Sequence, residues 1–197
     1  MTTPFPATSM PDRAWWAAVW PDPQATLVSL GVRPGMKVLD LCCGDGYFTA
    51  PLAKLVGGRV VALDLDPAMI ERAKAEAAVE GVSIERWICA DARDIAEYLP
   101  GPVDYVLMAN TFHGVPDQPG LAIAIRAILR QKGRLAILNW RQRPRETTVV
   151  LGQPRGPATA LRMSPEQVRA VVEPADFRFS ECFEIGLYHY GIIFETV

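Results

Sequence analysis

The stretch Val38-Leu-Asp-Leu-Cys-Cys-Gly-Asp-Gly-Tyr-Phe-Thr49 joins a short apolar run to a turn that contains two glycines. The apolar run predicts a buried strand, and the pattern from Tyr47 onward predicts a helix directly after it. Gly44 and Gly46 remove side chains where a ligand must lie close to the backbone. Open parallel sheets bind ligands over such a first strand-to-helix turn. This stretch therefore predicts both the fold and the place of the site.

Short apolar runs alternate with helical patterns on both sides of this turn. Strand and helix alternating five times predict an α/β fold with a Rossmann-like, doubly wound parallel sheet and right-handed crossovers. The expected strands are 36–42, 59–64, 84–90, 103–109 and 134–140, and the expected helices between them are 47–56, 67–80, 92–99 and 119–130.

The flanking segments have a different rhythm. Before the first strand, 13–20 and 24–30 are expected to be short helices, and we expect 1–35 to form an N-terminal helical arm or lid. After Arg141 come a stretch rich in proline and arginine, a helix from Ser164 to about Pro174, and two strands. We expect these two strands at 178–185 and 188–195, which makes 36–197 a single domain of seven strands.

Composition narrows the function classes. The chain has 197 residues, and its 20 Lys and Arg against 22 Asp and Glu give a formal net charge of -2. No basic footprint for nucleic acid follows from this balance. The start lacks a basic segment followed by an apolar run, and no window approaches a membrane span. The four cysteines form neither a disulfide framework nor a zinc spacing, so we expect free thiols in a cytoplasmic protein.

The carboxylates of the glycine turn decide which ligand suits it. A dinucleotide places its pyrophosphate on the helix N-terminus, so its loop continues with a third glycine and avoids acids. Here Thr49 stands at the third glycine position, and Asp40 and Asp45 would repel a pyrophosphate. A cationic ligand without phosphate fits better, as does S-adenosylmethionine (SAM) with its sulfonium and ammonium groups. A nucleotide-linked dehydrogenase is the more distant alternative.

Two further acids end the next two strands. Asp64 follows Gly46 by 18 residues, where a carboxylate accepts hydrogen bonds from both ribose hydroxyls. Asp91 follows the third strand, where it would accept from the adenine amino group. Each acid, taken alone, is equally compatible with a helix N-cap, as Asp66 before Pro67 illustrates. Three acids at three successive strand ends favour a ligand site over three caps.

The order of these motifs resembles that of the class I SAM-dependent methyltransferases, in particular the small-molecule (methyltransferase type 11, quinone-biosynthesis-like) subgroup. Residues 38–46, 61–73 and 90–92 resemble the first three motifs, and 103–117 and 127–137 resemble the fourth and fifth. The resemblance implies strand order 3-2-1-4-5-7-6 with an antiparallel last strand. It also implies SAM as cofactor and S-adenosyl-L-homocysteine as product.

Residue by residue, the resemblance assigns parts of SAM to this chain. Cys42 stands where the family usually has glycine, so the methionine tail is expected to be held slightly differently. Gln131-Lys-Gly133 replaces a Pro-Gly-Gly turn and is expected to affect only a connection. The implied contacts are Asp40, Cys42, Gly44 and Gly46 with the methionine moiety, Asp64 and Leu65 with ribose and adenine, Asp91 and Ala92 with the adenine edge, and the backbone of Asn110 near the sulfonium.

Methyl transfer mainly requires alignment of donor and acceptor and exclusion of water. A base helps a hydroxyl or ammonium nucleophile. His113, three residues beyond Asn110, is the candidate base; packing beside the cofactor is the other interpretation. His189 lies in a strand pattern and is expected to be structural. Clustered thiolates would favour a metalloid acceptor, but buried inert cysteines are favoured over this, and no metal site is predicted.

The class of acceptor is narrowed mostly by sequence signatures that the chain lacks. Residues 109–112 lack the signatures of amino-directed and cytosine-directed nucleic-acid methylation, and no glutamate lies between Asp104 and Arg141 to form the clamp of arginine methylation. Trp16 and Trp20 are candidates for an aromatic lid, with packing against the sheet as the alternative. Arg141 and Arg143 are candidates for holding an anionic acceptor, with a solvated loop as the alternative.

These observations predict an enzyme that methylates a small molecule by in-line transfer. The alternative is a SAM-binding protein without catalysis, acting as a regulatory or partner subunit. We expect no nucleic-acid partner and no membrane span, and a homodimer is possible.

Overall fold

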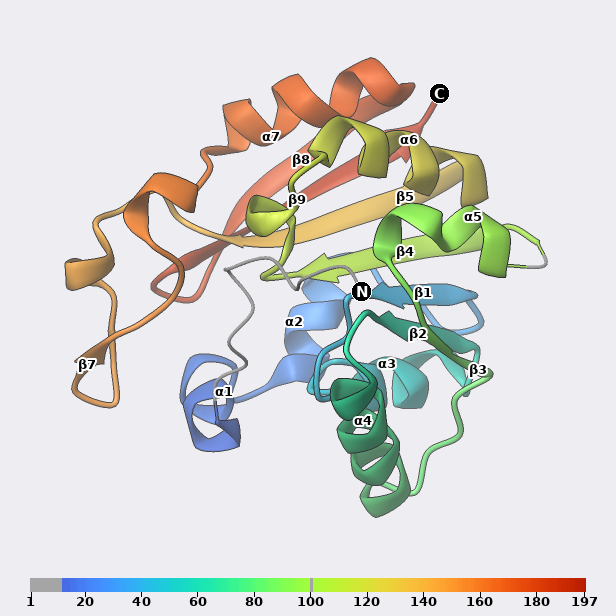
Figure 1. The fold of residues 1–197 in the computed structure, drawn as a ribbon, viewed down its shortest axis with the longest axis horizontal. Coiled ribbons are helices and arrows are strands. Elements are labelled where there is room, and N and C mark those ends of the chain that lie inside the picture. The colour runs from blue at the N-terminus through green and yellow to red at the C-terminus, as the bar shows by residue number, and fades with distance from the viewer. Residues whose placement is uncertain (1–11, 100) are drawn as a thin grey trace.

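A seven-stranded sheet with helices on both faces forms the body of the protein (Figure 1). The structure is a computed structural model and describes residues 12–99 and 101–197. The strand order is β3-β2-β1-β4-β5-β9-β8. The predicted order and the antiparallel final strand are therefore confirmed, with β9 antiparallel to β5. The strands are β1 (Val38–Leu41), β2 (Val60–Asp64), β3 (Arg86–Cys89), β4 (Val103–Ala109), β5 (Leu129–Trp140), β8 (Phe177–Ile185) and β9 (His189–Thr196).

The helices divide into two layers. In Figure 1, α5 (Ile95–Tyr98), α6 (Gln118–Ile128) and α7 (Pro165–Val172) cover the upper face, and α2 (Pro23–Ser29), α3 (Thr49–Val56) and α4 (Pro67–Val79) cover the lower face. Local chemistry fixes where two of them begin. Asp66 accepts from the amide of Ala68 and caps α4, as expected, and Ser164 forms a capping box with Gln167 at α7.

The N-terminal helix α1 (Arg13–Val19) joins the apolar cluster of the lower layer. Trp15, Trp16 and Trp20 are buried in it together with residues of β1, β4 and β5. This burial explains why α1 forms although it is only 7 residues long, because so short a helix depends on tertiary contacts. A lid role for 1–35 stays a prediction, and residues 1–11 of that segment lie outside the described residues.

Two local features were not predicted from the sequence. The expected helix 92–99 is a 3-10 turn, Ala92–Asp94, followed by the single helical turn α5. In the segment after β5, a small hairpin pairs β6 (Val149–Val150) with β7 (Gln153–Pro154). Its turn is Leu151-Gly152, both with positive φ (50° and 76°), and β6 contacts α1. Strands of two residues leave too little alternation for a pattern to predict.

No helix in the described part of the chain is both long and apolar enough to cross a membrane.

Candidate functional site

Asp64 holds the glycine turn against the end of β2. Its Oδ2 accepts from the amide of Gly44 at 2.8 Å, and its Oδ1 accepts from the amide of Asp66 at 2.9 Å. The carboxylate is only partly buried, and burial raises its pKa. Each carboxylate oxygen has further lone pairs, so Asp64 can still accept hydrogen bonds from a ligand while it orders the turn.

The backbone of the turn is left-handed at three places. The φ angles are 61° at Cys42, 55° at Gly44 and 85° at Gly46. A Cβ on Gly46 would lie 2.9 Å from the Cα of Ala73, so this glycine is also needed for the close approach of the turn to α4. Cys42 adopts a conformation that costs an L-residue about 1–2 kcal/mol. The family's usual glycine would not bear that cost.

Asp40 lies beneath the turn. It is 2% exposed, and the hydroxyl of Thr49 donates to its Oδ2 at 2.6 Å. Burial raises its pKa from 3.8 to about 7; the hydrogen bond from Thr49 lowers it, and the charge of Asp64 raises it further. Asp40 is therefore poised to gain or lose a proton near neutral pH, and a nearby cation would favour its ionised form.

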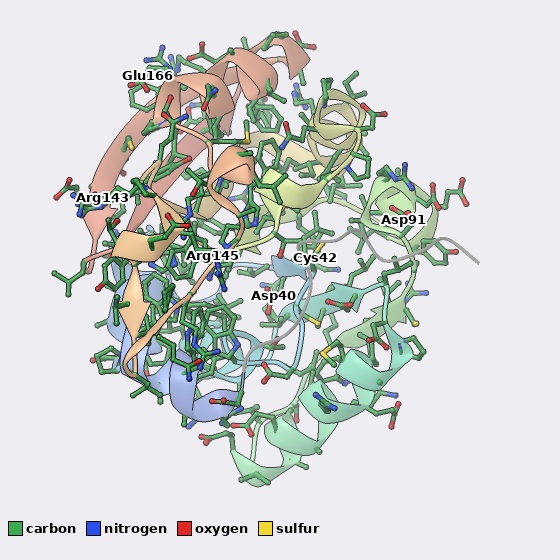
Figure 2. The ribbon with its side chains drawn as sticks, turned by 60° about the vertical axis from the view of Figure 1, so that its left-hand side comes forward. Asp40, Cys42, Asp91, Arg143, Arg145 and Glu166 are labelled. Carbon is green, nitrogen blue, oxygen red and sulfur yellow. The ribbon has the colours of Figure 1, made fainter. Side chains whose placement is uncertain are left out.

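Cys42 lies among the three predicted acids. Burial is the first cause that raises the pKa of its thiol, and the charges of Asp64, Asp40 and Asp91 each raise it further. Figure 2 shows Asp40, Cys42 and Asp91 along one edge of the sheet. In the described chain, neither Asp40 nor Asp64 is paired with a basic side chain. This negative edge suits the cationic groups of SAM and opposes a pyrophosphate.

Asp91 already has partners. It caps the 3-10 turn through the amide of Arg93, and its carboxylate accepts two hydrogen bonds from the Arg93 guanidinium, at 3.0 and 2.7 Å. These hydrogen bonds lower the pKa of Asp91. Leu65 and Ala92 are both half-buried. The assignment of Asp91 to the adenine amino group stays a prediction, because its cap role is present at the same time.

Asn110 ends β4 at the same edge. Its φ is 59°, and its amide donates to the carbonyl of Leu138 at 2.7 Å. Its side-chain Nδ2 and Oδ1 are buried without a hydrogen-bond partner among the described residues. A buried amide with both atoms unpaired costs several kcal/mol at most sites, so it indicates a missing ligand or water.

His113 belongs to a chain of hydrogen bonds that runs through β5 and β9 to the segment before α7. Its Nδ1 lies 3.0 Å from Asn139 Oδ1; Asn139 Nδ2 donates to Tyr190 Oη at 3.5 Å, and Tyr190 donates to the carbonyl of Met163 at 2.9 Å. Because Asn139 offers its oxygen, His113 Nδ1 must carry the proton. His113 Nε2 is then the bare nitrogen, and it is buried with no partner in the described chain.

Burial also sets the charge of His113. The side chain is 6% exposed, and burial is the main cause that lowers its pKa; the bond to Asn139 raises it, and the charge of Arg162 lowers it. The imidazole is therefore neutral at pH 7 and able to accept a proton at Nε2.

The predicted aromatic residues pack against one another. Trp16 lies 6.0 Å from Tyr47 between ring centroids, and Trp20 lies 4.4 Å from His189. His189 lies 4.1 Å from Trp140 on β5, and burial lowers its pKa well below the usual value. These contacts fit the packing interpretation of the tryptophans, and a lid role over an acceptor remains a prediction.

The predicted arginines do not share one environment. Arg141 pairs with Glu184 at 2.9 Å and donates to the carbonyls of His189 and Gly186, so its charge is already used. Arg143 is exposed, on the loop after β5 (Figure 2). The segment also holds Arg162, which is 3% exposed. Sequence reasoning missed it.

Asn139 is the other residue that sequence reasoning missed. It is fully buried and is the one uncharged polar side chain in the apolar run Leu135-Ala-Ile-Leu-Asn-Trp140. The sequence does hold a signal for Asn139: it is a polar residue inside a buried strand, next to the carboxyl end of that strand. In the part of the chain that the structure describes, no group of three or more His, Cys, Asp or Glu side chains is arranged to hold a metal ion.

Comparisons with known proteins agree with this geometry. Residues 38–133 match the family described as "Methyltransferase domain". A crystal structure of a SAM-dependent methyltransferase from Aquifex aeolicus is similar with a TM-score of 0.78 and 25% identity, over 94% of each chain. Magnesium protoporphyrin IX methyltransferase from Synechocystis PCC 6803, solved with bound SAM, shares the fold with a TM-score of 0.65 at 16% identity, over 94% of this chain and 81% of that one.

Two curated relatives differ in their acceptors. Nocamycin O-methyltransferase of Saccharothrix syringae is 32% identical over 140 residues, which cover 70% of this chain and 50% of that protein. The tRNA 5-carboxymethoxyuridine methyltransferase of Escherichia coli K12 is 32% identical over 123 residues, 62% of this chain and 46% of that protein. The chain spans half or less of the length of these relatives.

Proposed function

This chain carries a class I SAM-dependent methyltransferase domain, and from that premise we propose that it methylates a small-molecule acceptor. The supporting observation is the pairing of two features at one sheet edge. A turn lined by Asp40, Asp64 and Asp91 suits a cationic methyl donor. Beyond β4, His113 presents a buried, neutral Nε2 without a partner in the described chain.

The residues around the glycine turn would bind and orient SAM. Asp64 would accept from the ribose hydroxyls, and the turn from Cys42 to Gly46 would lie along the methionine part. SAM, when bound, supplies a methyl group already activated by its sulfonium. Asp40 would contribute its negative charge from beneath the turn, since its own oxygens face Thr49 rather than the surface.

The acceptor-side residues would manage a proton and water. His113 Nε2 would take the proton from an acceptor hydroxyl or amine as its oxygen or nitrogen gains the methyl group. Asn139 would keep Nε2 unprotonated beforehand, because its Oδ1 accepts from His113 Nδ1 and so holds the imidazole's own proton there. A base that is 6% exposed suits an acceptor small enough to enter the site. It suits a residue of a folded macromolecule less well.

Two experiments test the proposal in sequence. Calorimetry with SAM, S-adenosylhomocysteine and NAD should show binding of the first two only; binding of NAD without SAM would contradict the cofactor assignment. Incubation with methyl-labelled SAM and a metabolite extract should then give a labelled small molecule, with the Asp64→Ala variant as the blank. Label found only in added tRNA would contradict the small-molecule acceptor. SAM binding without any label would favour the non-catalytic alternative.

A further inference from the structure

The segment between β5 and α7 is strongly basic. Between 141 and 162 the chain has five arginines and a single acid, Glu146. Arg141 is the one of the five that forms an ion pair within the described chain, with Glu184. The segment follows the carboxyl end of β5, and Figure 2 labels two of its arginines, Arg143 and Arg145. The other four arginines form no ion pair among the described residues, so the segment keeps a net positive charge.

Arg162 is the buried member of this group. Its Nη2 donates to Thr148 Oγ1 at 2.8 Å and to the Arg155 carbonyl at 3.0 Å, and its Nε donates to the Pro157 carbonyl at 3.2 Å. Its guanidinium carbon lies 5.1 Å from the ring centre of Trp140. All these partners are neutral. Its Nη1 is buried without a partner among the described residues, and buried charges are normally paired.

Two more unpaired nitrogens belong to His113 and His189, and the ring of His189 lies 4.1 Å from Trp140, the same ring that Arg162 covers. The charge of Arg162 contributes to lowering the pKa of both His113 and His189, after the larger effect of burial. The Nε2 atoms of both histidines are buried without a partner in the described chain. The exposed fractions are 3% for Arg162, 6% for His113 and 1% for His189. Native proteins leave few such groups unpaired, so the buried, unpaired Nη1 of Arg162 beside Trp140 indicates an anionic ligand.

The surroundings narrow the chemistry of that ligand. Both histidines are neutral at pH 7, so Arg162 is the cation of the group. The neighbouring walls are aromatic, since Trp20 and Trp140 flank His189 at 4.4 and 4.1 Å between ring centres. A guanidinium binds carboxylate or phosphate through parallel hydrogen bonds. Aromatic walls favour an apolar or aromatic body.

We propose that Arg162, through Nη1, binds the anionic group of an acceptor that has an aromatic or apolar body. This assignment rests on the proposed function and names the substrate class for it: an aromatic carboxylate or an aryl phosphate. Under the proposed function, His113 Nε2 would take the proton from the nucleophilic group of the same molecule. Arg162, rather than Arg141, is the anchor, because the charge of Arg141 is already paired with Glu184.

Matched probes test the anion requirement without knowledge of the natural acceptor. The probes are benzoate, its neutral counterpart benzamide, and phenyl phosphate, titrated in the presence of S-adenosylhomocysteine and followed by calorimetry and tryptophan fluorescence. We expect at least one anion to bind ten-fold or more tightly than benzamide. Benzoate and phenyl phosphate as separate arms distinguish a carboxylate from a phosphate. Equal binding of the anions and benzamide would overturn the proposal.

Variants separate a binding role from a structural one. Arg162→Gln should abolish the preference for the anion, and Arg162→Lys should weaken it several-fold because the fork is lost. Thr148→Val removes one anchor of the arginine but leaves Nη1, and should keep the preference. An equal loss in Thr148→Val would assign the effect to loop geometry and overturn the proposal. Arg178→Gln, an exposed arginine on β8, is the charge control.

Binding of SAM keeps the two proposals distinguishable. All four variants should bind SAM as the unaltered protein does, because the altered side chains lie outside the glycine turn. If SAM binds and the enzyme labels a neutral molecule in the extract, the anion proposal fails while the methyltransferase proposal stands. If SAM does not bind, the methyltransferase proposal fails whatever the anions do.

Discussion

The proposed donor and acceptor sides of the site differ in charge and in how fully their polar groups are paired. On the donor side, Asp64 and Asp40 accept from the backbone or from Thr49, and their pairing holds the turn together. On the acceptor side, His113 and Arg162 keep buried nitrogens that have no partner in the described chain. A site for an invariant donor can be built into the local backbone. A site for a particular acceptor requires polar groups that stay unpaired until that acceptor forms hydrogen bonds with them.

The largest expected effect comes from breaking the donor side. Asp64→Ala removes the acceptor for the amides of Gly44 and Asp66 and for the ribose hydroxyls. We expect SAM to bind roughly a thousand-fold more weakly by calorimetry, since several charge-assisted hydrogen bonds are lost. Asp66→Asn keeps the α4 cap and should bind normally. Retained binding in Asp64→Ala would show that the turn orders itself without this carboxylate.

Removal of the proposed base acts on the acceptor side alone. His113→Gln should leave SAM affinity unchanged and lower turnover by about a hundred-fold, once an acceptor is known. Because burial lowers the pKa of His113, turnover of the unaltered enzyme should hold as pH falls to 6.5 and decline only below it. The variant should lack that decline. A turnover equal to that of the unaltered enzyme would remove His113 from the reaction.

Asn139 offers a sharper test of the same imidazole. Asn139→Leu frees His113 Nδ1 from its acceptor and should lower turnover about ten-fold, a fraction of the general-base effect. Asn139→Asp restores the acceptor and adds a charge that raises the pKa of His113, so the acid limb should move to higher pH. A purely structural role for Asn139 would lower stability in both variants without moving the limb, which is read from the pH dependence of turnover.

The donor side was predictable and the acceptor side mostly was not. Asp40, Asp64 and Asp91 follow three consecutive strands, so topology alone brings them to one edge. Arg162, the proposed anchor for the acceptor, lies in a segment with no periodic pattern that contains a hairpin of two-residue strands, and it contacts Trp140. Asn139 was readable only as a polar interruption of an apolar strand. Contacts set by irregular loops depend on tertiary packing, which local patterns do not encode.

Asp40 shows that the donor side carries a cost of its own when SAM is absent. Its folded-state pKa of about 7 exceeds the unfolded value of 3.8, so its contribution to stability is present below pH 4 and is lost as pH rises to 7. The stability of Asp40→Asn relative to the unaltered protein should therefore rise by on the order of 4 kcal/mol between pH 4 and pH 8. Urea unfolding across this range measures it, and a constant difference would contradict the raised pKa.

The smallest effect concerns the departure at Cys42. Cys42→Gly relieves a left-handed φ of 61° but increases the freedom of the unfolded chain and removes a half-buried thiol. The net change in stability should therefore stay within about 1 kcal/mol. Cys43→Gly is the matched control, because Cys43 is the neighbouring thiol in the turn but has no positive φ. It should be the more destabilised variant in urea unfolding. If both variants lose the same stability, Cys42 bears no backbone strain. The glycine usual in the family would then be explained by contact with the methionine part of SAM.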